Sequence, residues 1–123
     1  MRRARILVAD DEPIGVNLVG AILRRAGYEI TSATDGEAAL RRFREYVHDL
    51  VLLGIMLPKL DGFEVCARLR EWSTVPIIML TAVPDERDKA RCFRLGANDY
   101  LVKPFSIDEL VGKVQAALPP ESS

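Results

Sequence analysis

Residues that could handle a phosphoryl group and a divalent cation stand at three places along the chain. Two adjacent acids, Asp10 and Asp11, follow a short apolar run at residues 4–9. Adjacent carboxylates concentrate negative charge, which Mg²⁺ neutralises because this ion prefers carboxylate and water oxygens. Lys103 supplies a positive charge and Thr81 a hydroxyl donor, and both suit phosphoryl oxygens. Together they indicate metal-assisted phosphoryl chemistry, although each residue alone is more typical of a solvated turn, a strand or the surface.

Apolar runs predict five strands, and each of these residues directly follows the end of one. The strands are predicted at residues 4–9, 28–33, 49–53, 76–80 and 100–102. A helix is predicted after each strand, and this alternation favours an α/β domain with a five-stranded, doubly wound parallel sheet. Right-handed crossovers place helices on both faces of such a sheet, and ligands bind at the carboxyl ends of its strands. The candidate residues are therefore predicted to meet at one edge.

The helices are predicted from the spacing of apolar residues and from their end signals. Gly27 and Gly96 stand where a left-handed residue ends a helix, and Ser106 with Glu109 forms a capping box. The apolar positions assigned to the helices include Ile14 and Leu18 in the first and Val47 in the second. The predicted helices cover residues 13–26, 35–47, 63–72, 85–95 and 107–118.

Length and composition indicate one globular domain. The chain has 123 residues, 49% of them hydrophobic, with 17 basic and 18 acidic side chains. We expect a domain at residues 1–118 and a tail or linker at 119–123. The near-neutral charge argues against direct nucleic-acid binding, and no apolar run is long enough to span a membrane. No signal peptide is recognisable, so we expect a cytoplasmic protein with two free, buried thiols at Cys66 and Cys92.

Five segments form an ordered set of motifs: residues 6–13 (ILVADDEP), 34–40 (TDGEAAL), 57–62 (LPKLDG), 76–82 (PIIMLTA) and 96–105 (GANDYLVKPF). This set resembles the receiver (CheY-like) domain of bacterial two-component response regulators. It is most similar to the OmpR/PhoB subfamily, whose receivers carry a winged-helix DNA-binding domain. The resemblance covers residues 4 to about 118 and implies the flavodoxin-like (βα)5 fold with strand order 2-1-3-4-5.

The family resemblance implies a role for each residue at the strand ends. In receivers, a phosphoryl group passes from a histidine kinase to an aspartate at the end of the third strand. Asp10, Asp11 and the backbone carbonyl of Met56 would bind Mg²⁺, and Lys103 would bind the phosphoryl group. A cis peptide bond between Lys103 and Pro104 is also implied. Such a transfer depends mainly on positioning and charge neutralisation.

The chain departs from the family at the acceptor position. Gly54 stands where the acceptor aspartate belongs, and glycine has no side chain to form an acyl phosphate. We therefore expect no phosphorylation there, weakened or absent Mg²⁺ binding, and a Lys103 without its implied partner. Asp61 lies beyond Pro58 and is predicted to lie outside the pocket. An engineered substitution and a natural regulator that dispenses with phosphorylation would both explain the glycine.

Two further groups of residues have roles implied by the family. Thr81 and Tyr100 would form a switch pair, in which the threonine moves toward the phosphoryl group and the tyrosine turns inward. Five charged residues match the two-fold dimer interface of the subfamily: Lys89, Arg91, Asp99, Glu109 and Lys113. The expected pairs are Lys89–Glu109 and Asp99–Lys113, whereas Asn98 stands where an acid usually faces Arg91. Exposed ion pairs contribute about 0–1 kcal/mol each, so we expect a weak, salt-sensitive dimer.

The expected function is that of a signalling receiver and not of an enzyme. It would control transcription through a DNA-binding output domain outside this chain, with a histidine kinase and a second copy as protein partners. An Asp-based phosphatase is one alternative, but it would need an Asp-x-Asp spacing after the first strand. A flavodoxin-like small-ligand binder is another, and it would need a glycine-rich or hydroxyl-rich phosphate loop there. The chain has Asp10-Asp11-Glu12 at that position.

Overall fold

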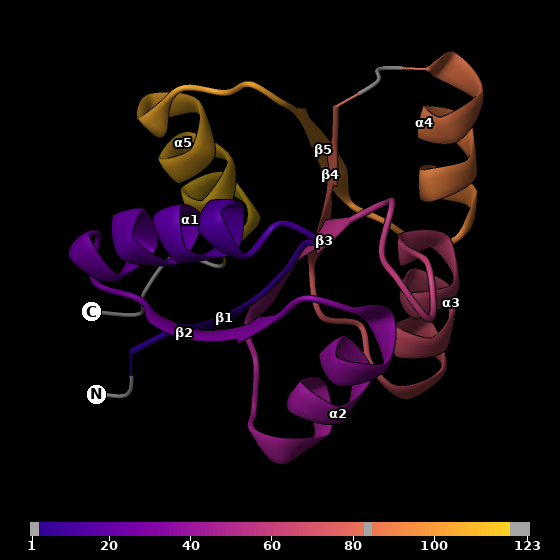
Figure 1. The fold of residues 1–123 in the computed structure, drawn as a ribbon, viewed down its shortest axis with the longest axis horizontal. Helices are drawn as coiled ribbons and strands as arrows, with labels where there is room; N and C mark the ends of the chain where they lie inside the picture. The colour runs from indigo at the N-terminus through magenta and orange to yellow at the C-terminus, as the bar shows by residue number, and fades with distance from the viewer. Residues whose placement is uncertain (1–2, 83–84, 119–123) are drawn as a thin grey trace.

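A parallel five-stranded sheet forms the centre of the protein (Figure 1). The computed structural model describes residues 3–82 and 85–118. The strands are β1 (Arg5–Ala9), β2 (Glu29–Ala33), β3 (Leu50–Gly54), β4 (Ile77–Thr81) and β5 (Asp99–Val102). The helices are α1 (Pro13–Arg25), α2 (Gly36–Glu45), α3 (Gly62–Trp72), α4 (Glu86–Arg94) and α5 (Ile107–Ala117). The strand order is β2-β1-β3-β4-β5, which confirms the predicted fold class and topology.

The helices cover both faces of the sheet (Figure 1). Successive strand residues point to opposite faces, so Ile6 belongs to the core beneath α1 and α5, and Leu7 to the core beneath α2, α3 and α4. Every residue of β3 is buried, as expected for the centre of a parallel sheet. This central strand therefore ends at Gly54 with neighbours on both sides.

The predicted elements all form, with boundaries within two residues of those expected. Three apolar residues lie elsewhere than predicted. Val47 is 71% exposed because Tyr46 has an extended backbone and ends α2 before it. Ile14 and Leu18 are 84% and 60% exposed, since only the stripe of α1 that includes Val19 faces the core.

The predicted helix ends and thiols are confirmed. Gly27 and Gly96 have φ angles of 104° and 105°, in the left-handed region that ends a helix. The capping box at the start of α5 has both of its hydrogen bonds. Cys66 and Cys92 are free and buried, and burial raises the pKa of both thiols, that of Cys92 to about 11. Both thiols are therefore protonated at neutral pH and serve as core side chains.

Close backbone packing sets the position of α3 against the end of β3. The amide of Gly62 donates a hydrogen bond of 2.7 Å to the carbonyl of Ile55. A Cβ atom at residue 62 would lie 2.1 Å from the carbonyl oxygen of Gly54, which is too close for any side chain. Glycine at this position therefore lets the first turn of α3 rest on the backbone of the central strand.

We predict that Gly62→Ala destabilises the fold by at least 1–3 kcal/mol, roughly the cost of an overpacked site. Gly112→Ala is the matched control, because a Cβ there meets nothing within 4 Å and the residue lies inside α5. Alanine should stabilise that helix by about 0.5–1 kcal/mol. Urea unfolding of both variants measures the two effects. A Gly62→Ala variant as stable as the parent would contradict the packing.

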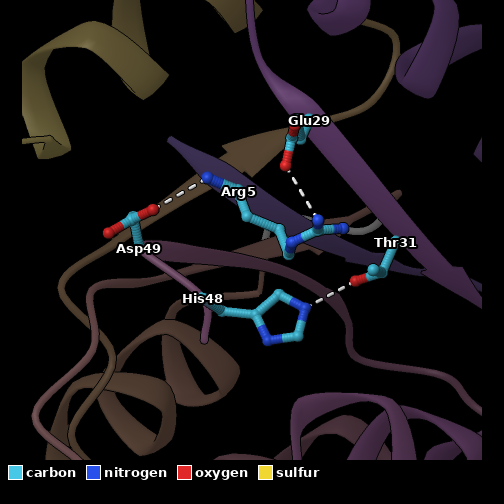
Figure 2. Close-up of polar contacts among 5 residues, drawn as sticks. All are labelled: Arg5, Glu29, Thr31, His48 and Asp49. Carbon is cyan, nitrogen blue, oxygen red and sulfur yellow. Dashed lines mark hydrogen bonds and ion pairs between the residues drawn. The ribbon is translucent and has the colours of Figure 1, made fainter. Parts of the chain in front are cut away.

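A polar cluster ties the strands together at the opposite end of the sheet (Figure 2). The Arg5 amide donates to the Asp49 carboxylate at 2.8 Å, and the Arg5 guanidinium donates to Glu29 at 2.8 Å. His48 is buried, and its Nε2 is hydrogen-bonded to the hydroxyl of Thr31 at 2.6 Å. Burial lowers the pKa of His48 from 6.5, and the positive charge of Arg5 lowers it further.

We predict that stability falls as the pH drops below about 6.5. The folded pKa of His48 lies below the unfolded value, so the unfolded chain binds more protons between the two values. The stability that this difference in pKa contributes is therefore fully present above the pKa of the unfolded state, and it is lost as the pH falls toward the pKa of the folded state. His48 is the only histidine in the chain, so His48→Gln should flatten the slope of unfolding free energy between pH 5.5 and 7, roughly the range in which histidine titrates. An unchanged slope in chemical denaturation would exclude this origin.

Candidate functional site

A cavity of about 260 Å³ lies at the carboxyl ends of the strands, and most of the predicted site residues surround it. The residues of its wall that were predicted from the sequence are Asp10, Asp11, Gly54, Met56, Thr81 and Lys103. They come from loops and strand ends far apart in the sequence, brought together because the parallel strands all end at this edge. Tyr100, the other residue of the implied switch pair, does not line the cavity.

An ion pair closes one side of this cavity. Asp10 is buried, and its Oδ1 accepts a hydrogen bond of 2.8 Å from the backbone amide of Asp11. Its Oδ2 is paired with the ammonium group of Lys103, which follows β5 and precedes a cis peptide bond to Pro104. Lys103 thus lacks the partner that the family implies at residue 54 and pairs with Asp10, a contact that the sequence did not predict. With no carboxylate at residue 54, the lysine pairs with the next acid within its reach.

The second acid, Asp11, is exposed to solvent. A hydrogen bond that protonated Asp11 donates to the Asp10 carboxylate is the main cause that raises the pKa of Asp11, and burial and the negative charge of Asp10 raise it further. The two carboxylates are thus close enough for the negative charge of one to oppose ionisation of the other. A cation between them and the exposed residue Met56 would relieve that repulsion.

The metal-binding capacity of this edge is limited. Among the described residues, no group of three or more His, Cys, Asp or Glu side chains is arranged to hold a metal ion. The two acids and one carbonyl fit a cation that keeps several waters, as Mg²⁺ does. Both oxygens of Asp10 already have one partner each, so a metal ion at this carboxylate would compete with Lys103 for its negative charge.

Residue 54 has just enough room for a side chain. A Cβ atom there would lie 3.3 Å from the carbonyl oxygen of Ala9 and 3.3 Å from Oδ1 of Asp10. Both contacts are tight, but a shift of a few tenths of an ångström relieves them. The glycine therefore leaves open the position of a side chain that would enter the cavity beside Asp10.

Two acids of the cavity wall were given no role from the sequence. Glu12 precedes α1, and Asp88 lies in the first turn of α4. Acids at the N-cap, such as Glu12, or in the first helical turn, such as Asp88, are common for electrostatic reasons alone, so their types carried no specific signal. Asp61 lies outside the cavity wall, as predicted, but lines a neighbouring depression together with Asp11. Its Oδ1 accepts a hydrogen bond of 3.0 Å from the amide of Glu64 and caps α3.

Tyr100 lies on the α4–β5–α5 face, partly buried between aromatic and charged neighbours. Its ring meets that of Phe93 edge-on at 6.4 Å, and the ammonium group of Lys89 lies 4.4 Å from the ring centroid. A hydrogen bond with Tyr100 raises the pKa of Lys89, and Glu86 adds a smaller effect. Lys89 also forms an ion pair of 3.5 Å with Glu86, so this lysine has partners on both α4 and β5.

The other residues of the implied dimer interface also have contacts within the chain. Lys113 donates to both carboxylate oxygens of Asp99, at 3.0 and 2.9 Å, so this pair forms inside one protomer. The guanidinium of Arg91 lies 4.1 Å from the ring centroid of Phe63. Oδ1 of Asn98 accepts from Arg70 at 2.8 Å and from the amide of Ile77 at 2.9 Å. Glu109 completes the capping box of α5.

Comparison with known protein families identifies the family of this chain. Residues 6–115 match the family model described as "Response regulator receiver domain". The chain belongs to the response regulator receiver family. In this chain the five parallel strands are combined with an acid pair after β1 and a lysine after β5. Within the described residues, no helix is long and apolar enough to cross a membrane.

Two curated relatives are named as transcriptional regulators. The chain is 48% identical over 115 residues to the alkaline phosphatase synthesis transcriptional regulatory protein PhoP of Bacillus subtilis, covering 93% of this chain and 48% of that protein. It is 47% identical over 118 residues to the "Probable transcriptional regulator ycf27" of Porphyridium aerugineum, covering 96% and 49%. The chain thus spans about half the length of the curated relatives it matches.

Solved structures of receivers have the same fold. The chemotaxis protein CheY4 of Vibrio cholerae superposes with a TM-score of 0.91 at 31% identity, covering 95% of this chain and all of that one. The receiver domain of the Francisella response regulator 1452 superposes with a TM-score of 0.87 at 33% identity, covering 94% and 96%. The CheY-like, flavodoxin-like fold expected from the sequence is therefore confirmed.

We predict that Lys103→Met destabilises the protein by about 1–3 kcal/mol, because it leaves the buried Asp10 carboxylate without its cation. This is less than for a fully buried pair because 29% of the Lys103 side chain stays exposed. Asp10→Asn should recover part of the loss in the double variant, giving a coupling that a double-mutant cycle in urea measures.

Lys59→Met is the control for this cycle, because its ion pair with Asp35 spans 3.8 Å and 60% of the lysine side chain is exposed. We expect a change within about 0.5 kcal/mol there. If the effects of the substitutions at residues 10 and 103 are additive, the ion pair contributes no measurable coupling free energy to folding.

Proposed function

We propose that the chain is a cytoplasmic receiver of a transcriptional response regulator that acts through protein contacts and is not phosphorylated at residue 54. One observation carries this proposal. A receiver-type cavity holds Asp10, Asp11, Thr81 and Lys103 around a glycine that lacks the acceptor carboxylate. The surrounding groups suit phosphoryl transfer, but the atom that would form the new bond is missing.

The remaining residues keep the roles that suit their positions. Receiver domains generally bind Mg²⁺ at the phosphorylation site. Asp10, Asp11 and the carbonyl of Met56 would hold the ion here, which would neutralise charge on phosphoryl oxygens. Lys103 would hold a phosphoryl oxygen once it leaves Asp10. Because Gly54 contributes no ligand, we expect weaker Mg²⁺ binding than in a receiver with an aspartate at this position.

The Asp10–Lys103 pair supports a resting state in which no phosphoryl signal is present. Lys103 neutralises Asp10 from within the chain, and Tyr100 is held by Lys89 and Phe93 away from the cavity. Thr81 and Tyr100 would be the switch pair of a phosphorylated receiver. Without a covalent phosphoryl group, no ligand biases this pair toward the active state.

An exposed apolar surface beside the cavity supports docking of a histidine kinase. Ile14 and Leu18 of α1 and Ile107 of α5 are 84%, 60% and 60% exposed. Leu18 and Ile107 line a groove of about 400 Å³ that also contains Asp10 and Lys103. Receivers typically interact with histidine kinases, and this groove would bring such a partner to the edge of the cavity. Contact with the kinase therefore does not require a residue that accepts the phosphoryl group.

The α4–β5–α5 face is the proposed surface for a second copy of the chain. Lys89, Arg91, Asp99, Glu109 and Lys113 lie on these elements, with Phe93 47% exposed among them. Because Lys113 already pairs with Asp99 inside the protomer, pairing across the two-fold axis would have to extend or exchange that contact. We therefore expect a weak dimer in which apolar contacts such as Phe93 contribute most.

An output domain would follow this receiver in the complete protein. Residues 1–118 form the proposed receiver, and the tail at residues 119–123, which lies outside the described residues, would begin the linker. The curated relatives are about twice as long and are named as transcriptional regulators, which supports a DNA-binding output domain. DNA contact would then come from that domain and not from the receiver. No observation favours the phosphatase or the small-ligand binder.

The proposal predicts that a single substitution restores phosphorylation. Gly54→Asp, incubated with acetyl phosphate and Mg²⁺, should gain the mass of one phosphoryl group, because the side chain would enter a cavity that already holds the other groups. The parent chain and Gly54→Asn should gain none, since neither has a carboxylate at this position. Intact-mass spectrometry distinguishes all three proteins.

Two results would contradict the proposal in different ways. A phosphoryl adduct on the parent chain would show that another acid, such as Asp88 or Asp61, accepts the group. No adduct on a folded Gly54→Asp variant would show that the cavity is not a working receiver site. Circular dichroism of each variant confirms that the fold is retained.

A further inference from the structure

A groove between α2 and α3 lies away from every residue assigned above. It has a volume of about 570 Å³, and its apolar lining residues are Leu40, Leu60 and Trp72. It shares no residue with the cavity at Gly54 or with the apolar groove beside α1 and α5. Helices α2 and α3 pack on the opposite face of the sheet from α1 and α5 (Figure 1). A partner can therefore bind this groove while another occupies α1 and α5.

An aromatic side chain lies open at one end of the groove. Trp72 is the only tryptophan of the chain, and 40% of it is exposed. The guanidinium of Arg44 lies 4.0 Å from the centroid of its ring. This contact holds the arginine over an apolar surface, so less side-chain freedom is lost when a ligand binds. Exposed tryptophan beside arginine is the composition typical of the centre of protein interfaces.

The rim of the groove has positive charge that the described part of the chain does not neutralise. Arg68 is paired with Glu64 at 3.3 Å, and Glu45 on the rim is paired with Arg42 at 3.4 Å. Arg41 and Arg44 form no ion pair within residues 3–82 and 85–118. Glu37 is the one rim acid without an ion pair among those residues. The rim therefore offers two arginines against one carboxylate.

We propose that the α2–α3 groove binds a short acidic peptide segment of a partner protein. An apolar side chain of the segment lies on Leu40, Leu60 and Trp72, and its carboxylates pair with Arg41 and Arg44. Guanidinium groups are weakly hydrated and bind carboxylates in a two-pronged geometry, so they favour this ligand over a neutral peptide. The ten residues of α2 are about 15 Å long, which matches roughly four or five residues of extended chain.

A selection from a library of short random peptides tests the proposal without knowledge of the natural partner. Peptides of about seven residues, long enough to fill the groove, are selected on the parent protein. They are then depleted on a variant with Arg41→Glu, Arg44→Glu and Trp72→Ala. The surviving sequences should share an apolar residue flanked by at least two acids. No enrichment after depletion, or survivors without acids, would overturn the proposal.

The affinity of a selected peptide is then measured by fluorescence of Trp72. Arg41→Glu with Arg44→Glu should raise Kd by about tenfold or more, since two attractive charge pairs become repulsive. Arg24→Glu with Arg87→Glu is the control, because both arginines are exposed and lie on α1 and α4. This control should stay within about twofold of the parent. Equal losses in the two double variants would mean that only the net charge of the protein matters.

Sedimentation velocity identifies the rival occupant. Self-association that disappears with Trp72→Ala would assign the groove to a second copy of this chain and overturn the peptide proposal. A parent protein whose sedimentation does not depend on Trp72 supports it. Circular dichroism of each variant shows whether a loss of binding reflects a loss of fold.

Discussion

Every functional feature of this protein depends on five parallel strands that end at the same edge. Because each strand is buried on one or both faces, its neighbours are fixed, and so are the positions where the chain leaves the sheet. Asp10 follows β1 and Lys103 follows β5, with β3 and β4 between these strands. The two residues still meet across the edge, and their ion pair closes the ring of loops around Gly54.

The same ion pair links the missing acceptor to the rest of the site. In a receiver with an aspartate at the end of β3, the lysine would have a third carboxylate available. Here Gly54 leaves Asp10 as its partner, and Asp10 is also the proposed metal ligand. The positive charge that would bind a phosphoryl oxygen therefore already neutralises the acid that would bind the metal. In the resting site, Lys103 takes the place of the metal ion at Asp10, and Asp10 takes the place of the phosphoryl group at Lys103.

Much of this arrangement could be predicted from the sequence, for physical reasons that differ by residue. Alternating strands and helices predicted a doubly wound parallel sheet, since buried parallel strands tolerate few topologies, and the family resemblance implied the strand order. The strand ends predicted the wall of the cavity around Asp10 and Lys103. The new partner of Lys103 was not predicted, because a flexible side chain chooses among several acids by distance. Asp88 was missed because the approach of α4 to the cavity depends on tertiary packing.

The surface was harder to predict than the core. The apolar pattern of α1 placed Ile14 and Leu18 with the buried residues, yet both are exposed at a groove. Spacing along a helix identifies its apolar residues but not which of them a neighbouring element covers. The contact of Arg44 with Trp72 joins two helices, and nothing in the local sequence of either signals it.

The open space at Gly54 also bears on how such a protein changes over generations. The Cβ atom of a side chain there would meet the backbone carbonyl of Ala9 and the carboxylate of Asp10, and small shifts of these two neighbours would relieve both contacts. Two of the four glycine codons differ from an aspartate codon by a single nucleotide. One point mutation could therefore switch the lineage between a receiver that stores a phosphoryl group and one that does not, with the rest of the fold unchanged.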